Sequence, residues 1–159
     1  MDLSINLENY KLNIRAAGII IHDNKILVHK NMNEGHYALI GGRVELGEDS
    51  ETTLKRELME EIGKEVEITG SIGTIENFFK INDLKYHEIL FIHQAEFKNE
   101  EDKKITGTMN NIEGKDYLKY EWLDIDKLEQ YKLLPEVTKK LLKEKKFPVH
   151  KINIDNKCT

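Results

Sequence analysis

Cysteine is nearly absent from this chain of 159 residues, whose single cysteine, Cys158, stands one residue from the end. One cysteine cannot form an intrachain disulfide, which excludes a disulfide-stapled scaffold and leads us to expect a reducing, cytoplasmic setting. No apolar run approaches the ~20 residues that a membrane span needs. Residues 1–4 lack the basic region and apolar stretch of a secretory signal, so neither a membrane protein nor an exported one is expected.

Arginine is also scarce: of the 24 basic residues, only Arg15, Arg43 and Arg56 are arginine. The 29 acidic residues outnumber the 24 basic ones. The net charge of −5 and the pI of about 5.7 make nucleic acid an unexpected partner, because such binding requires clustered Lys and Arg. If the substrate is an anion, a bound cation is the obvious means of attracting it.

What the chain does contain is typical of a globular domain, with 39% hydrophobic and 33% charged residues. The length suits one compact core. With no internal repeat, low-complexity tract or linker, we expect a single domain over residues 1–159. Its core is predicted at about residues 15–146, and residues 149–159 are interpreted as a tail.

Short β-branched apolar runs predict most of the strands. The run Arg15–His22 is typical of a strand buried on both faces, and the turn Asp23-Asn24 joins it to a second strand, Lys25–His29, in a hairpin. A third strand at residues 37–40 is predicted to stop at Gly41-Gly42. Four more strands are predicted at residues 66–69, 72–81, 86–97 and 119–123.

The apolar spacing then changes to a helical period. Leu54, Leu58 and Ile62 recur every four residues, with Ser50 as a suitable N-cap and Gly63 as a suitable C-terminal cap. These signals predict a helix over residues 50–62.

A second helix is predicted to open at Leu134-Pro135, with Val137 and Leu141 on one face. The polar segment at residues 98–116 is interpreted as a loop. Strands on both sides of one helix, followed by a second helix, indicate an α/β fold with a mixed β-sheet covered on both faces.

Three acids of the first predicted helix are clustered on one of its faces, an arrangement that is unfavourable without a partner. At ~100° per residue, Glu57, Glu60 and Glu61 fall within an arc of about 100°, and Glu61 lies only ~20° from Leu54 of the apolar stripe. Like charges at these spacings repel by roughly 0.2–0.5 kcal/mol per pair, and a carboxylate beside a buried stripe is unfavourable unless it is paired or bound to a metal. Arg56, one turn before Glu60, is expected to neutralise that one acid but not all three.

The residues around these acids give them a specific context. From Gly42 to Gly63 the chain reads Gly-(five)-Glu-(seven)-Arg-Glu-Leu-x-Glu-Glu-x-Gly, which resembles the Nudix box. The sequence departs from the family pattern at Lys64, where an aliphatic residue is usual, and at Ile40, where a proline often stands. The resemblance extends over about residues 15–146 and implies the family's αβα sandwich, although only the box is specific.

The resemblance to the Nudix family also implies a mechanism. Glu57, Glu60 and Glu61 are expected to bind Mg²⁺ or Mn²⁺, which carboxylate oxygens suit, and Glu57 is also a possible base. Glu48 is expected near the metal, directly or through water, and Arg56 is expected to hold the glutamates in place.

Weaker expectations concern residues near the box. Gly42 and Gly63 are expected to serve backbone conformation, at a turn and a helix cap. Arg43 either touches a phosphate or pairs with Glu45 or Glu48. Glu113 resembles a position at which some family members carry a further acidic ligand or base, although loop glutamates are usually solvated.

Other polar and aromatic residues carry less specific signals. Glu88 lies in a predicted strand, where pairing within the core is the favoured interpretation. The rings of Phe78, Phe79 and Tyr86 are candidates for stacking on a base, but strand aromatics more often belong to the core. The six histidines show no metal-binding spacing.

The expected function is metal-dependent hydrolysis of the pyrophosphate bond in a nucleoside diphosphate linked to another group. Nucleoside triphosphates, dinucleoside polyphosphates and nucleotide sugars all remain open as substrates, although the proline linked to ADP-ribose hydrolysis is missing. The alternative is a catalytically silent Nudix-fold domain that binds a nucleotide and regulates a partner. Such domains usually lose box carboxylates, whereas this chain keeps them all. A homodimer is a further expectation.

Overall fold

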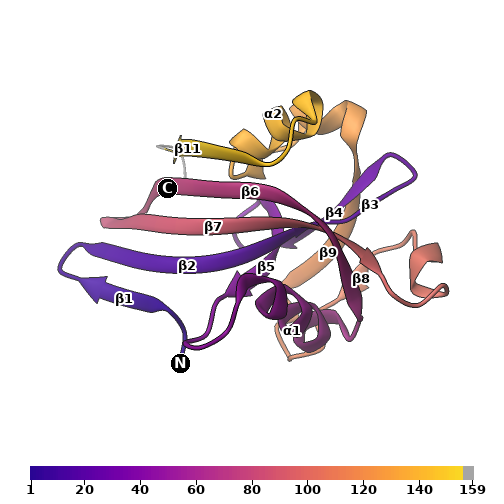
Figure 1. Cartoon of the computed structure of the whole chain (residues 1–159), viewed down its shortest axis with the longest axis horizontal. Helices are drawn as coiled ribbons and strands as arrows, with labels where there is room; N and C mark the ends of the chain where they lie inside the picture. Colours follow the sequence, from indigo (N-terminus) through magenta and orange to yellow (C-terminus); the bar gives the residue numbers. More distant parts are fainter. Residues whose placement is uncertain (156–159) are drawn as a thin grey trace.

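The fold is a strongly twisted mixed sheet with one α-helix on each side (Figure 1). The computed structural model describes residues 1–155, and Cys158 lies outside the described residues. The strands are β1 (Ser4–Leu7), β2 (Tyr10–Ile19), β3 (Ile21–His22), β4 (Lys25–Asn31), β5 (Tyr37–Arg43), β6 (Val66–Ile81), β7 (Leu84–Phe97), β8 (Met109–Asn110), β9 (Leu118–Asp124), β10 (Leu133–Leu134) and β11 (Val149–Asp155). The helices are α1 (Ser50–Ile62), α2 (Val137–Glu144) and the 3-10 turns η1 (Asp102–Lys104) and η2 (Ile125–Gln130).

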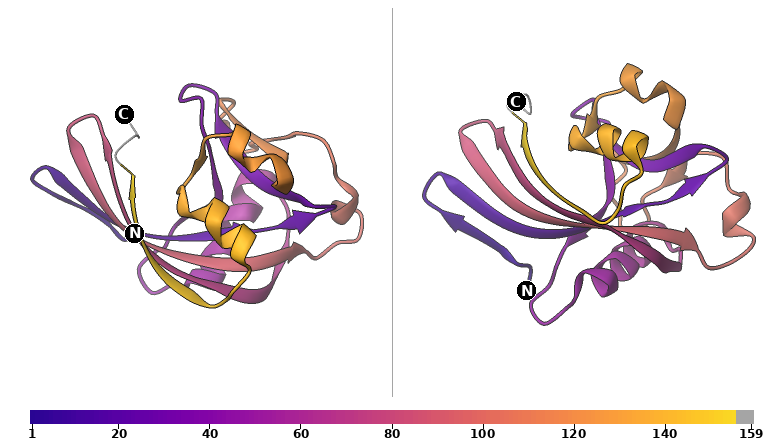
Figure 2. Two further views of the ribbon diagram at one scale, coloured as in Figure 1. Left: turned by 90° about the horizontal axis from the view of Figure 1, so that it is seen from above. Right: turned by 45° about the horizontal axis from the view of Figure 1, so that its top comes forward.

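Strand β5 joins two parts of the sheet, whose order is β11-β6-β7-β2-β5-β4-β9-β8. Residues 37–39 of β5 pair with β4, whereas residues 40–43 pair with β2. The two parts diverge from this shared strand, as the two views of Figure 2 show. Because β5 leads directly into the loop before α1, the divergence lies beside that helix.

Two apolar cores lie on opposite faces of the sheet. Leu54, Leu58 and Ile62 of α1 pack with residues such as Ala16 and Ile40 on one face. On the other face, Leu141 and Leu142 of α2 pack with strand residues including Ile75, Leu90 and Ile92. The α/β class and the sheet covered on both faces are therefore confirmed.

Several predicted boundaries are wrong. Strand β5 does not stop at Gly41-Gly42 but continues to Arg43, because both glycines pair with β2. The helix cap is Asp49 rather than Ser50, since the Asp49 carboxylate accepts a hydrogen bond from the Thr52 amide. The segment at residues 98–116 contains η1 and β8.

The C-terminal region also differs from the prediction. Helix α2 begins at Val137, two residues after Pro135, because Leu133 and Leu134 pair with β5 instead. The interpretation of a tail is wrong for Val149–Asp155, which form β11 parallel to β6 and thereby give β6 a hydrogen-bonded neighbour. Neither α-helix within residues 1–155 is long and apolar enough to cross a membrane.

Candidate functional site

Helix α1 is held firmly at both ends. Asp49 caps the N-terminus, with its carboxylate 2.8 Å from the Thr52 amide nitrogen. Gly63 ends the helix at φ 67°, a left-handed conformation that glycine adopts without strain, and its amide donates to Met59. The apolar stripe is buried, so the polar face of α1 is fixed in orientation.

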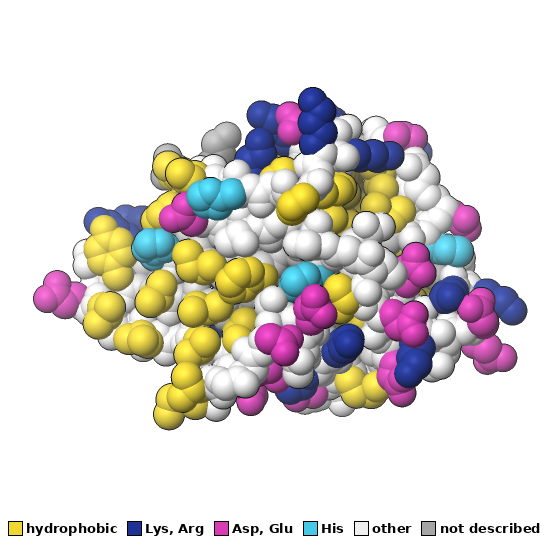
Figure 3. All heavy atoms as spheres, viewed as in Figure 1, with side chains coloured by type: hydrophobic (Ala, Val, Ile, Leu, Met, Phe, Trp, Pro, Cys, Tyr) yellow, Lys and Arg dark blue, Asp and Glu magenta, His cyan; other side chains and the backbone are white. Residues whose placement is uncertain are grey.

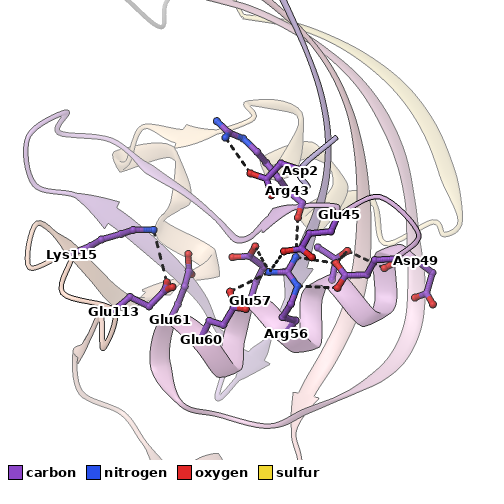
Figure 4. Close-up of polar contacts among 12 residues, drawn as sticks. Asp2, Arg43, Glu45, Asp49, Arg56, Glu57, Glu60, Glu61, Glu113 and Lys115 are labelled. Atoms are coloured by element: carbon purple, nitrogen blue, oxygen red, sulfur yellow. Dashed lines mark hydrogen bonds and ion pairs between the residues drawn. The ribbon is translucent and has the colours of Figure 1, made fainter. Parts of the chain in front are cut away.

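Arg56 is the centre of the ion pairs on that face (Figure 4). Its Nε and Nη2 each donate to a different Glu48 oxygen at 2.9 Å, and Nη1 lies 2.9 Å from Glu57 Oε1 and 3.1 Å from Glu60 Oε2. Nη2 also donates to the Arg43 carbonyl. Of the three acids in the arc, Arg56 pairs with Glu57 as well as Glu60, which is one more than expected. It does not pair with Glu61, so the expectation that it would not neutralise all three agrees with the structure.

These contacts change the acidity of the acids that they join. The hydrogen bonds from Arg56 lower the pKa of Glu48 to about 2. Burial is the largest influence on Glu57 and raises its pKa, although Arg56 opposes the shift. The same carboxylates raise the pKa of Arg56, so the guanidinium stays charged.

Glycine at position 42 makes room for Glu57. A Cβ added at Gly42 would overlap the Glu57 carboxyl group, so no other residue fits there without displacing this acid. Gly42 pairs with Ala16 of β2, which fixes the strand under α1. The predicted role of Gly42 at a turn is wrong, since it lies within β5 and serves a close approach instead.

Glu61 is the most deeply buried acid of the box, with 6% of its surface exposed. It accepts a hydrogen bond of 3.0 Å from the Tyr120 hydroxyl of β9. Burial raises the pKa of Glu61 to about 7, and the charges of Glu57 and Glu113 act in the same direction. The protonated form of Glu61 is therefore favoured to a higher pH than in an exposed glutamate, as long as no cation lies beside it.

The loop before β9 brings two charged residues, Glu113 and Lys115, to the side of α1 that carries Glu61 (Figure 4). Figure 4 shows Glu113 beside Glu61, with Lys115 reaching Glu113 at 3.9 Å. The Ile112 amide donates to the Glu61 carbonyl, which ties this loop to the end of α1. The structure thus places Glu113 next to the box acids.

A cleft of about 790 Å³ opens beside these residues. Of the expected site residues, Gly42, Arg43, Glu57 and Glu61 line it. Glu60 lies at the outer side of α1, with 44% of its side chain exposed, and Glu48 is turned toward Arg56.

Arg43 has a different partner from the two predicted. Its Nη1 lies 3.4 Å from Asp2 Oδ2, and 42% of its side chain is exposed at the cleft. The predicted pair with Glu45 or Glu48 is wrong, because Arg56 takes Glu48 and lies 4.0 Å from Glu45.

The carboxylates that line the cleft have the oxygen atoms that a divalent cation prefers as ligands. Glu57 and Glu61 bring carboxylate oxygens, which are hard donors, to one cleft, and Gly42 leaves space for the Glu57 carboxyl group. No group of three His, Cys, Asp or Glu side chains within residues 1–155 stands ready to share an ion. Glu57 and Glu60 each accept a hydrogen bond from Arg56 Nη1.

Two partners of the box acids were missed from the sequence. Tyr120 faces Glu61, and Thr53 donates to Glu48 and to the Asp49 carbonyl. The alternation of Leu118, Tyr120 and Trp122 does signal an inward face of β9, since all three pack in the core beside α1. It does not reveal which helix residue that face meets.

Comparison with known proteins gives a consistent picture. A family model described as NUDIX domain matches residues 12–144. An ADP-ribose pyrophosphatase from Methanocaldococcus jannaschii is 40% identical over 75 residues, which cover 43% of this chain and 44% of that protein. The match thus spans less than half the length of this relative.

Solved structures resemble the whole fold. A MutT protein from Bacillus halodurans has a TM-score of 0.61 at 19% identity, over 82% of this chain and 80% of that one. A MutT NUDIX hydrolase from Burkholderia pseudomallei has a TM-score of 0.61 at 22% identity, over 83% and 96% of the two chains. At such identities the likeness establishes the fold alone.

Proposed function

The chain belongs to the Nudix family, and on this premise we propose that it hydrolyses the pyrophosphate bond of a nucleoside diphosphate linked to another group. The observation that carries the proposal is the cleft, which Glu57 and Glu61 line from α1 while Arg43 lines it from β5. The name of the archaeal relative, an ADP-ribose pyrophosphatase, describes a substrate of this class.

We propose Mg²⁺ or Mn²⁺ as the cofactor, with Glu57, Glu60 and Glu61 as ligands and Glu48 nearby. Such an ion, when bound, neutralises the diphosphate and lowers the pKa of a water. With an ion bound, Arg56 would keep Glu48 through Nε and Nη2, and Glu57 and Glu60, which only Nη1 contacts, would be free to turn to the ion. Arg43, exposed at the cleft, binds a phosphate oxygen.

Proton transfer is assigned to the acids of the cleft. Glu57 lines the cleft and is proposed as the base that accepts a proton from the attacking water. Tyr120 orients Glu61 through their hydrogen bond. Glu113 stands close enough to Glu61 to influence its charge and is proposed as an auxiliary acid of the site.

The homodimer and the cytoplasmic setting also remain proposals. Beyond α1, one face of the sheet carries a cross-strand row formed by Ile5, Leu12, His87, Phe78 and Ile154. Ile5 and Ile154 are 51% and 65% exposed, and Figure 3 shows hydrophobic side chains gathered over this region. Contiguous exposed apolar surface of this kind marks an interface, and we propose that a second copy covers it.

A substrate screen with product identification tests the proposed activity. Nucleoside triphosphates, dinucleoside polyphosphates and nucleotide sugars are incubated with Mg²⁺ or Mn²⁺, and the products are identified by mass spectrometry. We expect a nucleoside monophosphate together with pyrophosphate or a phosphorylated remainder. Binding of these compounds without any turnover would favour the silent regulatory domain instead.

A further inference from the structure

The sheet face opposite α1 carries a row of buried polar side chains. Asn13 of β2, Glu88 of β7, Asn77 of β6 and Asn153 of β11 are successive cross-strand neighbours. Their exposed fractions are 3%, 3%, 5% and 7%, respectively. Buried polar groups cost free energy unless each is hydrogen-bonded, so this polar row requires an explanation.

Hydrogen bonds along the polar row end at Glu88. Asn153 donates to Asn77 at 2.7 Å, and Asn77 donates to Glu88 Oε1 at 3.2 Å. Glu88 Oε2 is buried and accepts no hydrogen bond from any described residue. Its nearest cationic atom is Arg15 Nη1, 3.9 Å away on a side chain that is 31% exposed. A buried acceptor therefore lies beside a donor group that reaches solvent.

The polar row lies in the same cleft as the box acids. Asn13, Asn77 and Glu88 line the cleft together with Glu57 and Glu61. Asn13 precedes Ala16, the residue paired with Gly42, by three positions, which is ~10 Å along β2. One ligand can therefore contact the box acids with one of its ends and the polar row with the other.

Aromatic rings stand next to the polar row. Phe79 and Tyr86 are the next inward pair along β6 and β7, stack at 4.6 Å between ring centroids and line the cleft. Flat apolar groups beside hydrogen-bonding edges are the surroundings that a nucleobase requires. The sequence-based interpretation of Glu88 as a core pair accounts for Oε1, but it leaves Oε2 without a hydrogen bond, because Arg15 Nη1 stays 3.9 Å away.

We propose that the polar row binds the base of the nucleotide and that Glu88 and Arg15 select guanine. The proposal rests on the proposed function, which supplies the nucleotide. A carboxylate has about four acceptor positions, of which Asn77 uses one, so Glu88 can accept from both N1–H and N2–H of guanine. The guanine O6 then meets the Arg15 guanidinium. Adenine offers one donor on this edge and forms one bond fewer.

Equilibrium binding of mononucleotides tests this selection without metal or turnover. Calorimetry in EDTA compares GMP with IMP, which lacks only the 2-amino group, and with AMP. Loss of a hydrogen bond to a charged group weakens binding by at least ~10-fold, so we expect GMP to bind that much more tightly than IMP or AMP. Equal affinities, tighter binding of AMP, or no binding of GMP would overturn the proposal.

Substitution of Glu88 assigns the preference to this side chain. In Glu88→Gln, the affinity for GMP is expected to exceed the affinity for IMP by less than ~3-fold. The exposed control on the same strand, Glu96→Gln, is expected to retain the wild-type ratio of the two affinities. Thermal melts verify that both variants fold. An unchanged affinity ratio in folded Glu88→Gln contradicts the proposal. If Glu88→Gln is also less stable than wild type while the affinity ratio is unchanged, Glu88 is a structural partner of Arg15 and does not select the base. Selective GMP binding without hydrolysis would contradict the proposed function alone.

Discussion

At the scale of single residues, Glu61 shows how burial prepares an acid for a cation. Its carboxyl group is buried and lies near the charges of Glu57 and Glu113, so the charged form is disfavoured when no cation is bound. A carboxyl group whose pKa is raised on folding stabilises the fold while it is protonated. That contribution is complete below the ordinary pKa of 4.5 and is lost as the pH rises through about 7.

Glu61→Gln should therefore remove a pH-dependent loss of stability. A pKa that rises from 4.5 to about 7 corresponds to roughly 3 kcal/mol at 1.36 kcal/mol per unit. In EDTA, wild type should lose about this much free energy of unfolding relative to Glu61→Gln between pH 4.5 and 8. Urea unfolding across this range measures the difference, and parallel curves for the two proteins would contradict the prediction.

Gly42 permits a second test at the residue scale. Gly42→Ala should lower kcat by at least ~100-fold with little loss of folding, because the new methyl group displaces the Glu57 carboxyl group from its position. Gly107→Ala is the matched control, since a Cβ there meets no atom within 4 Å. Steady-state rates and thermal melts of both variants provide the measurement. Normal turnover by Gly42→Ala would show that the position of Glu57 is not critical.

At the scale of elements, α1 was predicted with its correct bounds because its signals are local. Three apolar residues at helical spacing, a capping region and a terminal glycine all act within one segment. Strand β11 was missed because the pattern Val149, Ile152, Ile154 does not bury one face by itself. Its strand conformation depends on hydrogen bonds from β6, more than sixty residues away.

The same distinction applies to the site. The box glutamates were found because their spacing lies within one helix, whereas the polar row comes from four strands that register brings together. No spacing in the sequence relates Asn13 to Asn77. Glu88 stood out only as an acid within an apolar strand.

Arg56 connects α1 with the loop before it, which makes it the test at this scale. Arg56→Lys should destabilise the protein by about 1–3 kcal/mol in EDTA, because lysine cannot donate to Glu48 through two nitrogens while also reaching Glu57. The exposed Lys55→Arg serves as a control for the change in side-chain shape. Urea unfolding measures both, and an unaffected Arg56→Lys would mean that these ion pairs contribute little.

At the scale of the whole molecule, the cleft results from the way β5 divides its pairing between two strands. The sequence predicted a mixed sheet but not this divergence, which depends on pairing between distant segments. The same twisted sheet leaves the apolar row at Ile5 and Ile154 beyond the reach of α1.

The proposed homodimer is a prediction about this exposed face. Ile5→Lys/Ile154→Lys should convert a dimer into a monomer, because burying two added charges in an apolar interface is unfavourable. Light scattering coupled to size-exclusion chromatography gives the mass directly, and Met32→Lys, at an exposed site elsewhere, is the control. A wild-type monomer, or a double variant that remains dimeric, would contradict the proposed interface.

The most direct test of metal-dependent hydrolysis by the α1 acids is the rate of nucleotide cleavage with and without a divalent cation. Wild type and Glu57→Gln are freed of metal, and mononucleotide release from the preferred substrate is measured in EDTA and in saturating Mg²⁺. We predict turnover by wild type in Mg²⁺, none in EDTA, and a rate at least ~100-fold lower for Glu57→Gln in Mg²⁺. Undiminished wild-type turnover in EDTA, or a normal rate for Glu57→Gln, would contradict this account.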